Sequence, residues 1–187
     1  MSGTQASAFN EKKATQAAAY FLKLAGSDMD YLRLMKLMYL MERASLIQRG
    51  RPVTYDKYYS LTWGPVLSRV LDLVHRNAYN AIGYWEEHIG NSGTDHVFLR
   101  ADPGGDLLSR SELRFIDSVF GSFGEIDGLS LAKLTHNLPE WKDPNGSSIP
   151  ITIAEILTAG GKSSEDAQAI SAEVNAVQHF RSMFGSR

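Results

Sequence analysis

Residues 28–49 constrain the fold more than any other stretch, because their apolar side chains would point almost all the way round a helix. Asp28 and Asp30 offer carboxylate oxygens to the free N–H groups at a helix start. Gly50 offers the stop at the other end. A helix that is apolar on nearly every side is buried among other elements. The sequence therefore predicts a central buried helix with the rest of the chain packed around it.

Length and composition favour one globular domain. The chain has 187 residues, of which 43% are hydrophobic and 21% charged, and it contains no cysteine. The lack of cysteine excludes disulfides, thiol catalysis and cysteine-rich zinc sites. We see no signal peptide and no stretch apolar enough to span a membrane, so we expect a cytoplasmic protein. We expect residues 1–8 to be a flexible N-terminus and residues 9–187 to form the domain.

The remaining apolar spacing predicts a mainly α fold with one small β-hairpin. Helices are expected over residues 9–24, 65–76, 109–121, 129–136, 151–159 and 163–185. Residues 51–62 are expected to form a loop with one short turn. Apolar and polar residues alternate over 84–89 and 96–101 around turn chemistry at 90–94, which predicts a two-stranded hairpin.

The residues show no catalytic constellation. His88 and His96 would meet across the hairpin near Glu86 and Asp95, and two histidines with a carboxylate are a plausible zinc set. Exposed polar residues of a hairpin are the commoner explanation. No Ser–His–Asp spacing or nucleophile elbow stands out. We therefore expect no enzymatic activity, no metal and no cofactor, and we keep a metal-dependent enzyme using His88, His96 and His136 as an alternative.

The charge distribution is uneven although the net charge is only −2. Residues 33–57 carry six basic and two acidic side chains, a balance of +4, whereas residues 84–127 carry nine acidic and three basic ones, a balance of −6. We interpret these as two solvated faces that attract each other, and the alternative is a bipolar surface that steers a charged partner. A narrow basic stripe is expected on the central helix through Arg33, Lys36 and Arg43. The low net charge argues against a nucleic-acid partner. A DNA-binding regulator stays as an alternative, and it would use Arg33, Lys36, Arg43, Arg49, Arg51 and Lys57.

Three motifs in order resemble a known family. The first is Leu-Met-Lys-Leu-Met-Tyr-Leu-Met at residues 34–41, leading to Gly-Arg-Pro-Val at 50–53. The second is Tyr-Ser-Leu-Thr-Trp-Gly-Pro-Val at 59–66, and the third is Leu-Ala-Lys-Leu-Thr-His at 131–136, followed by Trp141. Together they resemble the Panacea domain of the SocA-like antitoxins, whose members include phage-associated proteins. The resemblance extends over roughly residues 10 to 160. In that family the proline directly precedes the tryptophan, whereas Glu140 intervenes here.

The resemblance implies an antitoxin of a toxin–antitoxin system that neutralises its cognate toxin by direct protein binding. It also implies a second mode, in which the antitoxin acts as a proteolytic adaptor and delivers the toxin to a protease. No membrane partner is implied. The matching landmark residues, which are candidates for partner binding, are Lys36, Tyr39, Trp63, Gly64, Pro65, His136 and Trp141. The alternative is that these residues serve the fold alone.

Overall fold

The computed structural model describes residues 8–76, 83–93 and 95–184. The segment expected to be flexible, residues 1–8, lies outside these ranges except for Ala8. The elements in chain order are α1 (Glu11–Leu24), β1 (Asp28–Asp30), α2 (Tyr31–Arg49), β2 (Tyr58–Leu61), β3 (Gly64–Leu67), α3 (Ser68–Arg76), α4 (Tyr84–His88), β4 (Ile89–Ser92), β5 (His96–Leu99), α5 (Arg110–Phe123), α6 (Gly128–Thr135), β6 (Ile149–Ile151), α7 (Ile153–Ala159) and α8 (Ser164–Phe184).

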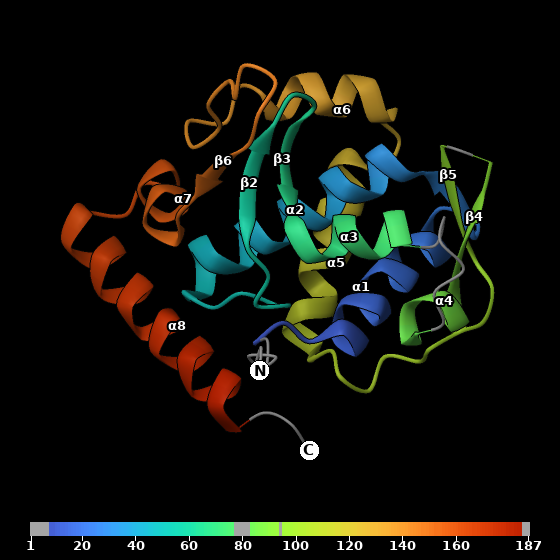
Figure 1. Cartoon of the computed structure of the whole chain (residues 1–187), viewed down its shortest axis with the longest axis horizontal. Coiled ribbons are helices and arrows are strands. Elements are labelled where there is room, and N and C mark those ends of the chain that lie inside the picture. Colours follow the sequence, from blue (N-terminus) through green and yellow to red (C-terminus); the bar gives the residue numbers. More distant parts are fainter. Residues whose placement is uncertain (1–7, 77–82, 94, 185–187) are drawn as a thin grey trace, which may run out of the picture.

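Helix α2 is the axis of the fold, as the sequence predicts. It packs against α1, α5, α6, α7 and β3, and its side chains from Leu34 to Met41 are buried. In Figure 1 it runs through the middle of the molecule behind β2 and β3. Gly50 ends the helix in the left-handed conformation, with φ of 65°. The helix starts at Tyr31, later than expected, because Asp28–Asp30 pair with β5 and the Asp30 carboxylate caps the N–H of Arg33.

The hairpin expected over residues 84–101 is part of a larger sheet. Strands β4 and β5 pair antiparallel as predicted, and β1 adds to the other side of β5 in the order β1-β5-β4. Residues 84–88, however, form the short helix α4 rather than a strand. Helix α4 packs against α1, where Trp85 is fully buried and its backbone N–H donates to the Glu11 carboxylate. This contact across the chain overrides the local alternation.

A second sheet corrects the expectation of a single hairpin. Residues expected as loop form β2, and residues expected to begin a helix at Pro65 form β3. Strand β2 pairs antiparallel with both β3 and β6, in the order β3-β2-β6. The partner β6 comes from residues far along the chain, so the local sequence carries no sign of it. Helix α3 therefore starts at Ser68 and is described as far as Arg76, and its predicted end adjoins residues 77–82, which lie outside the described residues.

Helix caps place the remaining helices close to their predicted positions. Ser109 and Glu112 form a capping box at the start of α5, and Thr152 and Glu155 form another at α7. Helix α6 starts at Gly128 with Asp127 as its cap, and α5 runs past Gly121 to Phe123. Helix α7 ends at Ala159 as predicted, and α7 and α8 start within two residues of their predicted first residues.

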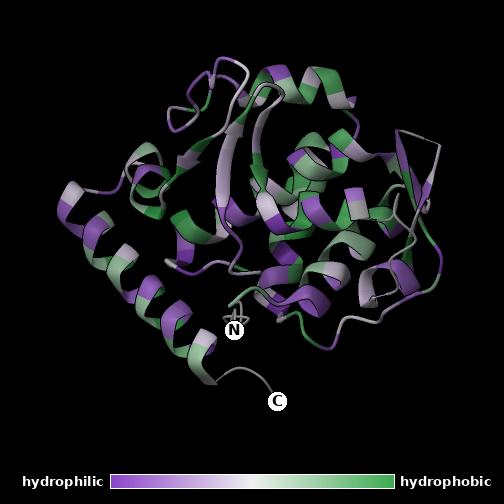
Figure 2. Cartoon of the chain, in the orientation of Figure 1, coloured by the Kyte–Doolittle hydropathy of each residue, from purple (hydrophilic) through white to green (hydrophobic). Residues whose placement is uncertain are grey.

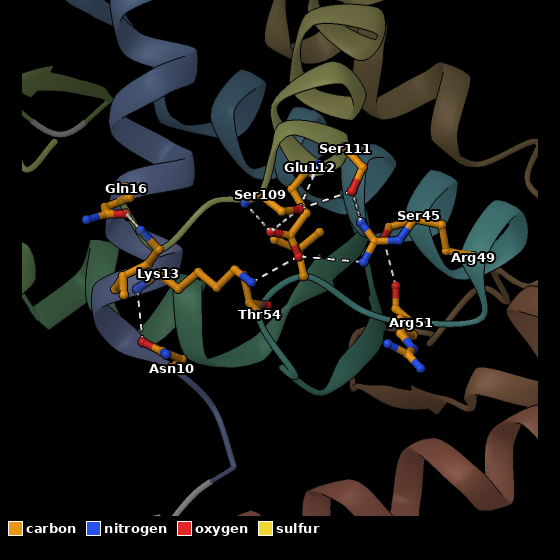
Figure 3. A network of polar contacts seen from close by, with 12 residues as sticks. Asn10, Lys13, Gln16, Ser45, Arg49, Arg51, Thr54, Ser109, Ser111 and Glu112 are labelled. Atoms are coloured by element: carbon orange, nitrogen blue, oxygen red, sulfur yellow. Dashed lines mark hydrogen bonds and ion pairs between the residues drawn. The ribbon is translucent and has the colours of Figure 1, made fainter. Parts of the chain in front are cut away.

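Glu112 joins three helices through one carboxylate, as Figure 3 shows. Its Oε1 lies 2.9 Å from Lys13 Nζ of α1 and 3.8 Å from Arg49 Nη2 of α2. Its Oε2 accepts from the N–H and the hydroxyl of Ser109, which closes the capping box. Arg49 belongs to the basic segment and Glu112 to the acidic one, so the two segments are in contact at this helix junction.

Helix α8 lies along one side of the molecule, where it packs mainly on α7 (Figure 1). Figure 2 shows a ribbon of mixed and largely hydrophilic character there, in contrast to the hydrophobic ribbon around α2. Its inner side buries Ala167 and Val174, while Phe180 and Met183 are exposed near its end. Within the described ranges, no helix combines the length and apolar character needed to cross a lipid bilayer.

The Glu112 junction leads to a stability prediction. Glu112→Ala removes the capping box and leaves Lys13 and Arg49 without their shared carboxylate, so we expect a loss of about 2 kcal/mol in the free energy of unfolding. Glu112→Gln keeps an oxygen for the cap and should lose less. Urea unfolding followed by circular dichroism measures both. An alanine variant as stable as the wild type would contradict this role for Glu112.

Candidate partner-binding site

The turn between β2 and β3 displays the large aromatic side chain of Trp63. This side chain is 57% exposed, whereas Tyr58 and Val66 on the strands of the hairpin are buried. The next residue, Gly64, has φ of 95°, a conformation that side-chain-bearing residues rarely adopt. The sequence Trp-Gly-Pro thus makes a tight turn that holds an exposed indole.

Gly64 is required by space as well as by conformation. A Cβ at this position would lie 2.6 Å from Thr135 Oγ1 of α6 and 3.2 Å from Lys36 Nζ of α2. It would also lie 3.4 Å from His136 Cδ2. The hairpin backbone therefore rests directly on α2 and on the end of α6, which fixes the position of the turn.

Lys36 fastens α2 to the hairpin from inside. Its side chain is buried, and Nζ donates a hydrogen bond of 2.9 Å to the carbonyl of Pro65. No carboxylate among the described residues forms an ion pair with it. Burial lowers the pKa of Lys36 from 10.5 to about 7, because a low-dielectric surrounding disfavours the charged ammonium.

His136 and Trp141 brace the other side of the hairpin. Their rings stack with centroids 4.1 Å apart and an interplanar angle of 16°. The indole N–H of Trp141 donates to the carbonyl of Leu61 at 3.1 Å, and the N–H of Lys142 donates to Ser60 Oγ at the same distance. The loop after α6 is therefore tied to β2 along its length.

Glu140 is a site residue that the sequence reasoning missed. Its side chain is buried, and Oε1 accepts hydrogen bonds from the Tyr39 hydroxyl at 3.0 Å and from Arg43 Nε at 2.6 Å. Tyr39 and Arg43 are four residues apart and so share one face of α2. That spacing, together with an acidic residue between Pro139 and Trp141, was the available signal. The Glu140 carboxylate fastens the loop after α6 to α2.

The structure gathers the seven landmark residues around the β2–β3 hairpin but gives them different exposures. Lys36, Tyr39, Gly64 and Pro65 are buried, and His136 and Trp141 are partly buried. Trp63 alone among the seven is largely exposed. The stacked His136–Trp141 pair lies against the backbone on both sides of Trp63, since His136 approaches Gly64 and Trp141 donates to the carbonyl of Leu61. We call the surface formed by Trp63 and the His136–Trp141 pair the hairpin surface.

The basic stripe on the central helix does not form an open cationic face. Lys36 is buried against Pro65, and Arg43 is paired with buried Glu140. Arg49 is engaged with Glu112 on α5. Of the basic side chains proposed for DNA binding, those of Arg51 and Lys57 are exposed. They do not continue a basic face of α2, because α2 turns its charges toward neighbouring elements.

The histidines considered for zinc do not meet. His88 Nδ1 lies 2.8 Å from the carbonyl of Tyr84 within its own helix, and His96 Nδ1 lies 2.7 Å from Asp28 Oδ1. His136 is stacked on Trp141 at the hairpin surface. Among the described residues, no group of three or more histidine, aspartate or glutamate side chains is arranged to hold a metal ion.

Comparison with known proteins gives one match. A family model described as antitoxin SocA-like, Panacea domain, matches residues 34–142, which is more than half of the chain. The matched segment runs from α2 to the loop after α6 and contains every landmark residue. No curated protein and no solved structure matches the chain.

The close approach at Gly64 leads to a second prediction. Gly64→Ala should lower the free energy of unfolding by about 3 kcal/mol, because it combines an unfavourable φ with a clash against Thr135. Gly146→Ala is the matched control, since Gly146 has φ of 81° and nothing within 4 Å of an added Cβ. The control should lose only about 1 kcal/mol. Equal losses in urea unfolding would show that the contact with α6 is unimportant.

The buried lysine predicts a particular pH dependence. Its pKa is about 7 in the folded protein and 10.5 ordinarily, so the unfolded chain binds more protons between these values. Stability should therefore rise from pH 7 to pH 9, by up to about 1.4 kcal/mol per pH unit. Lys36→Met should remove most of this rise. The measurement is urea unfolding at several pH values, and parallel curves for the two proteins would refute the assignment.

Proposed function

The chain belongs to the family of SocA-like antitoxins with a Panacea domain, and we propose on this basis that it neutralises a cognate toxin by direct protein–protein binding. The hairpin surface supports the proposal. Trp63 is large, 57% exposed and held by a rigid turn, so little conformational entropy is lost when a partner covers it. Tryptophan is the residue type most enriched among side chains that dominate binding energy at protein interfaces.

The architecture beneath Trp63 supports a binding role for the turn. The Lys36–Pro65 hydrogen bond, the Gly64 contact with α6 and the Trp141–Leu61 hydrogen bond all act on the same hairpin. If Trp63 served only to pack the fold, we would expect its indole to be buried, as that of Trp85 is. A preorganised turn that exposes its largest apolar side chain is typical of a binding hot spot.

Two modes of neutralisation follow from such binding. In the first, the antitoxin covers the working surface of the toxin. In the second, it delivers the bound toxin to a protease. The modes differ in the amount of toxin that remains, since masking preserves the toxin and delivery removes it. Immunoblotting of the toxin, with and without the antitoxin, distinguishes them.

The proposal predicts that Trp63→Ala abolishes protection. The protein encoded by the adjacent gene is expressed alone and together with each antitoxin variant, and growth is measured. Loss of an interface hot spot of about 2 kcal/mol weakens binding roughly 30-fold, which pull-down or calorimetry with the purified pair would detect. The variant should keep the wild-type unfolding curve, because the indole is exposed.

Met183→Ala is the matched control, because Met183 is also 57% exposed but lies near the end of α8. It should protect as the wild type does. The proposal fails if the adjacent gene product is harmless when expressed alone, or if it does not bind the chain. The assignment of Trp63 to the toxin-binding site fails if the Trp63→Ala and Met183→Ala variants protect equally.

A further inference from the structure

A groove runs between α8 and the segment that leads into β2, away from the hairpin surface. Two adjoining hollows of about 350 and 450 Å³ form it. They share Asp56, Lys57, Asn175 and Gln178, so they are continuous. One wall is the segment 55–59 with β6, and the other is the inner side of α8, which Figure 1 shows extending along this side of the molecule. We call this hollow the α8 groove.

Two buried carboxylates hold the backbone of the wall formed by residues 55–57. Tyr55 has φ of 59°, a strained value for a residue with a side chain. On one side of it, buried Glu42 accepts the N–H groups of Val53 and Thr54 at 2.8 and 2.6 Å. On the other side, Asp56 accepts the N–H groups that follow it. Tyr55 is therefore fixed between two buried carboxylates.

Tyr55 in turn holds the far half of α8. The guanidinium of Arg181 lies 4.1 Å from the centre of the Tyr55 ring. Gln178 Nε2 donates to the Tyr55 carbonyl at 3.5 Å. These two contacts span the groove near its end, so the strained loop sets the distance between its walls.

The groove is lined by cations without a matching anion at its surface. The cations are Lys57 and Arg69, and Lys57 forms no ion pair with any described residue. Arg69 forms an ion pair with exposed Asp72 at 3.8 Å. Its charge also acts on Asp56, where burial raises the pKa of the carboxyl to about 6 and Arg69 opposes part of that rise. The sole carboxylate in the lining is that of Asp56. It is buried and turned inward, where it accepts the N–H groups of Lys57, Arg69 and Val70 at 2.6, 2.9 and 3.0 Å.

The side-chain amides of Asn175 and Gln178 complete the lining with groups that both donate and accept hydrogen bonds. A narrow trough with amides along it and cations at its rim matches an extended peptide that carries carboxylates. A nucleic-acid duplex fits it less well, because the hollows have only the volume of a small ligand site. None of the seven landmark residues lines the groove, and α8 lies outside the segment that matches the family model.

We propose that the α8 groove binds an extended, acidic segment of the toxin, as a second contact separate from the hairpin surface. The assignment of the segment to the toxin rests on the proposed function. The assignment of the chemistry rests on the groove alone. A toxin that contacts two separate surfaces binds more tightly than either contact alone would allow. Once the first contact has formed, the second forms within the same complex at a high effective concentration.

The chemistry is tested with a fluorescein-labelled peptide of alternating glutamate and tyrosine, measured by fluorescence anisotropy against the full chain. A peptide with glutamine in place of glutamate is the neutral probe, and a labelled single-stranded oligonucleotide is the nucleic-acid probe. We expect the acidic peptide to bind, with an affinity that falls as salt is added. Lys57→Glu should weaken it about tenfold, and Lys133→Glu, the same charge change on exposed α6, should leave it within about twofold.

Equal binding of the acidic and neutral peptides would overturn the proposal, as would equal effects of the two lysine variants. Binding of the oligonucleotide but not of the acidic peptide would show that the groove binds a nucleic acid and not an acidic peptide. The assignment to the toxin is tested separately, by protection of growth with the Lys57→Glu, Arg69→Glu double variant. Full protection by this variant overturns the toxin assignment. A harmless adjacent gene product defeats the proposed function, whereas the peptide measurement stands by itself.

Discussion

The hydrogen bond from Lys36 to the Pro65 carbonyl is the constraint on which the hairpin depends. It joins the most buried helix to the strand that follows the exposed turn. Burying an ammonium without a carboxylate partner is costly, and here the cost appears as a pKa of about 7. The contact fixes the position of the hairpin. The Pro65 carbonyl is bound to Lys36, Gly64 lies against α6, and Trp63 remains exposed at the surface.

Buried carboxylates play the complementary part in the loops. Glu140 joins the loop after α6 to α2, Glu42 and Asp56 hold the backbone on both sides of Tyr55, and Glu112 joins three helices. Glu140, Glu42 and Asp56 each fix a stretch of chain that has little regular structure of its own. Both candidate interaction surfaces are therefore carried by short irregular segments, and buried charged side chains hold these segments in place.

Much of the helical framework could be predicted, and the sheets mostly could not. Helix α2 with its Gly50 stop, the capping box at α5 and the start of α8 all depend on neighbours in sequence. Strand β2 depends on β6, which lies far along the chain, and α4 depends on the burial of Trp85 against α1. For the site, the motifs located the landmark residues. They could not separate exposed Trp63 from buried Lys36, because exposure is a property of packing.

The sequence by itself determined the family, the buried axis and the ends of the main helices, since periodicity, caps and motif order are local properties of the chain. Only the tertiary structure decided which charges are interior. In the basic stripe of α2, Lys36 is buried under the hairpin and Arg43 is paired with buried Glu140. It also decided that α8 stands beside the Tyr55 loop and leaves a cation-lined groove between them. The physical reason is that a charge is placed by the partners that fold around it, and those partners come from distant parts of the chain.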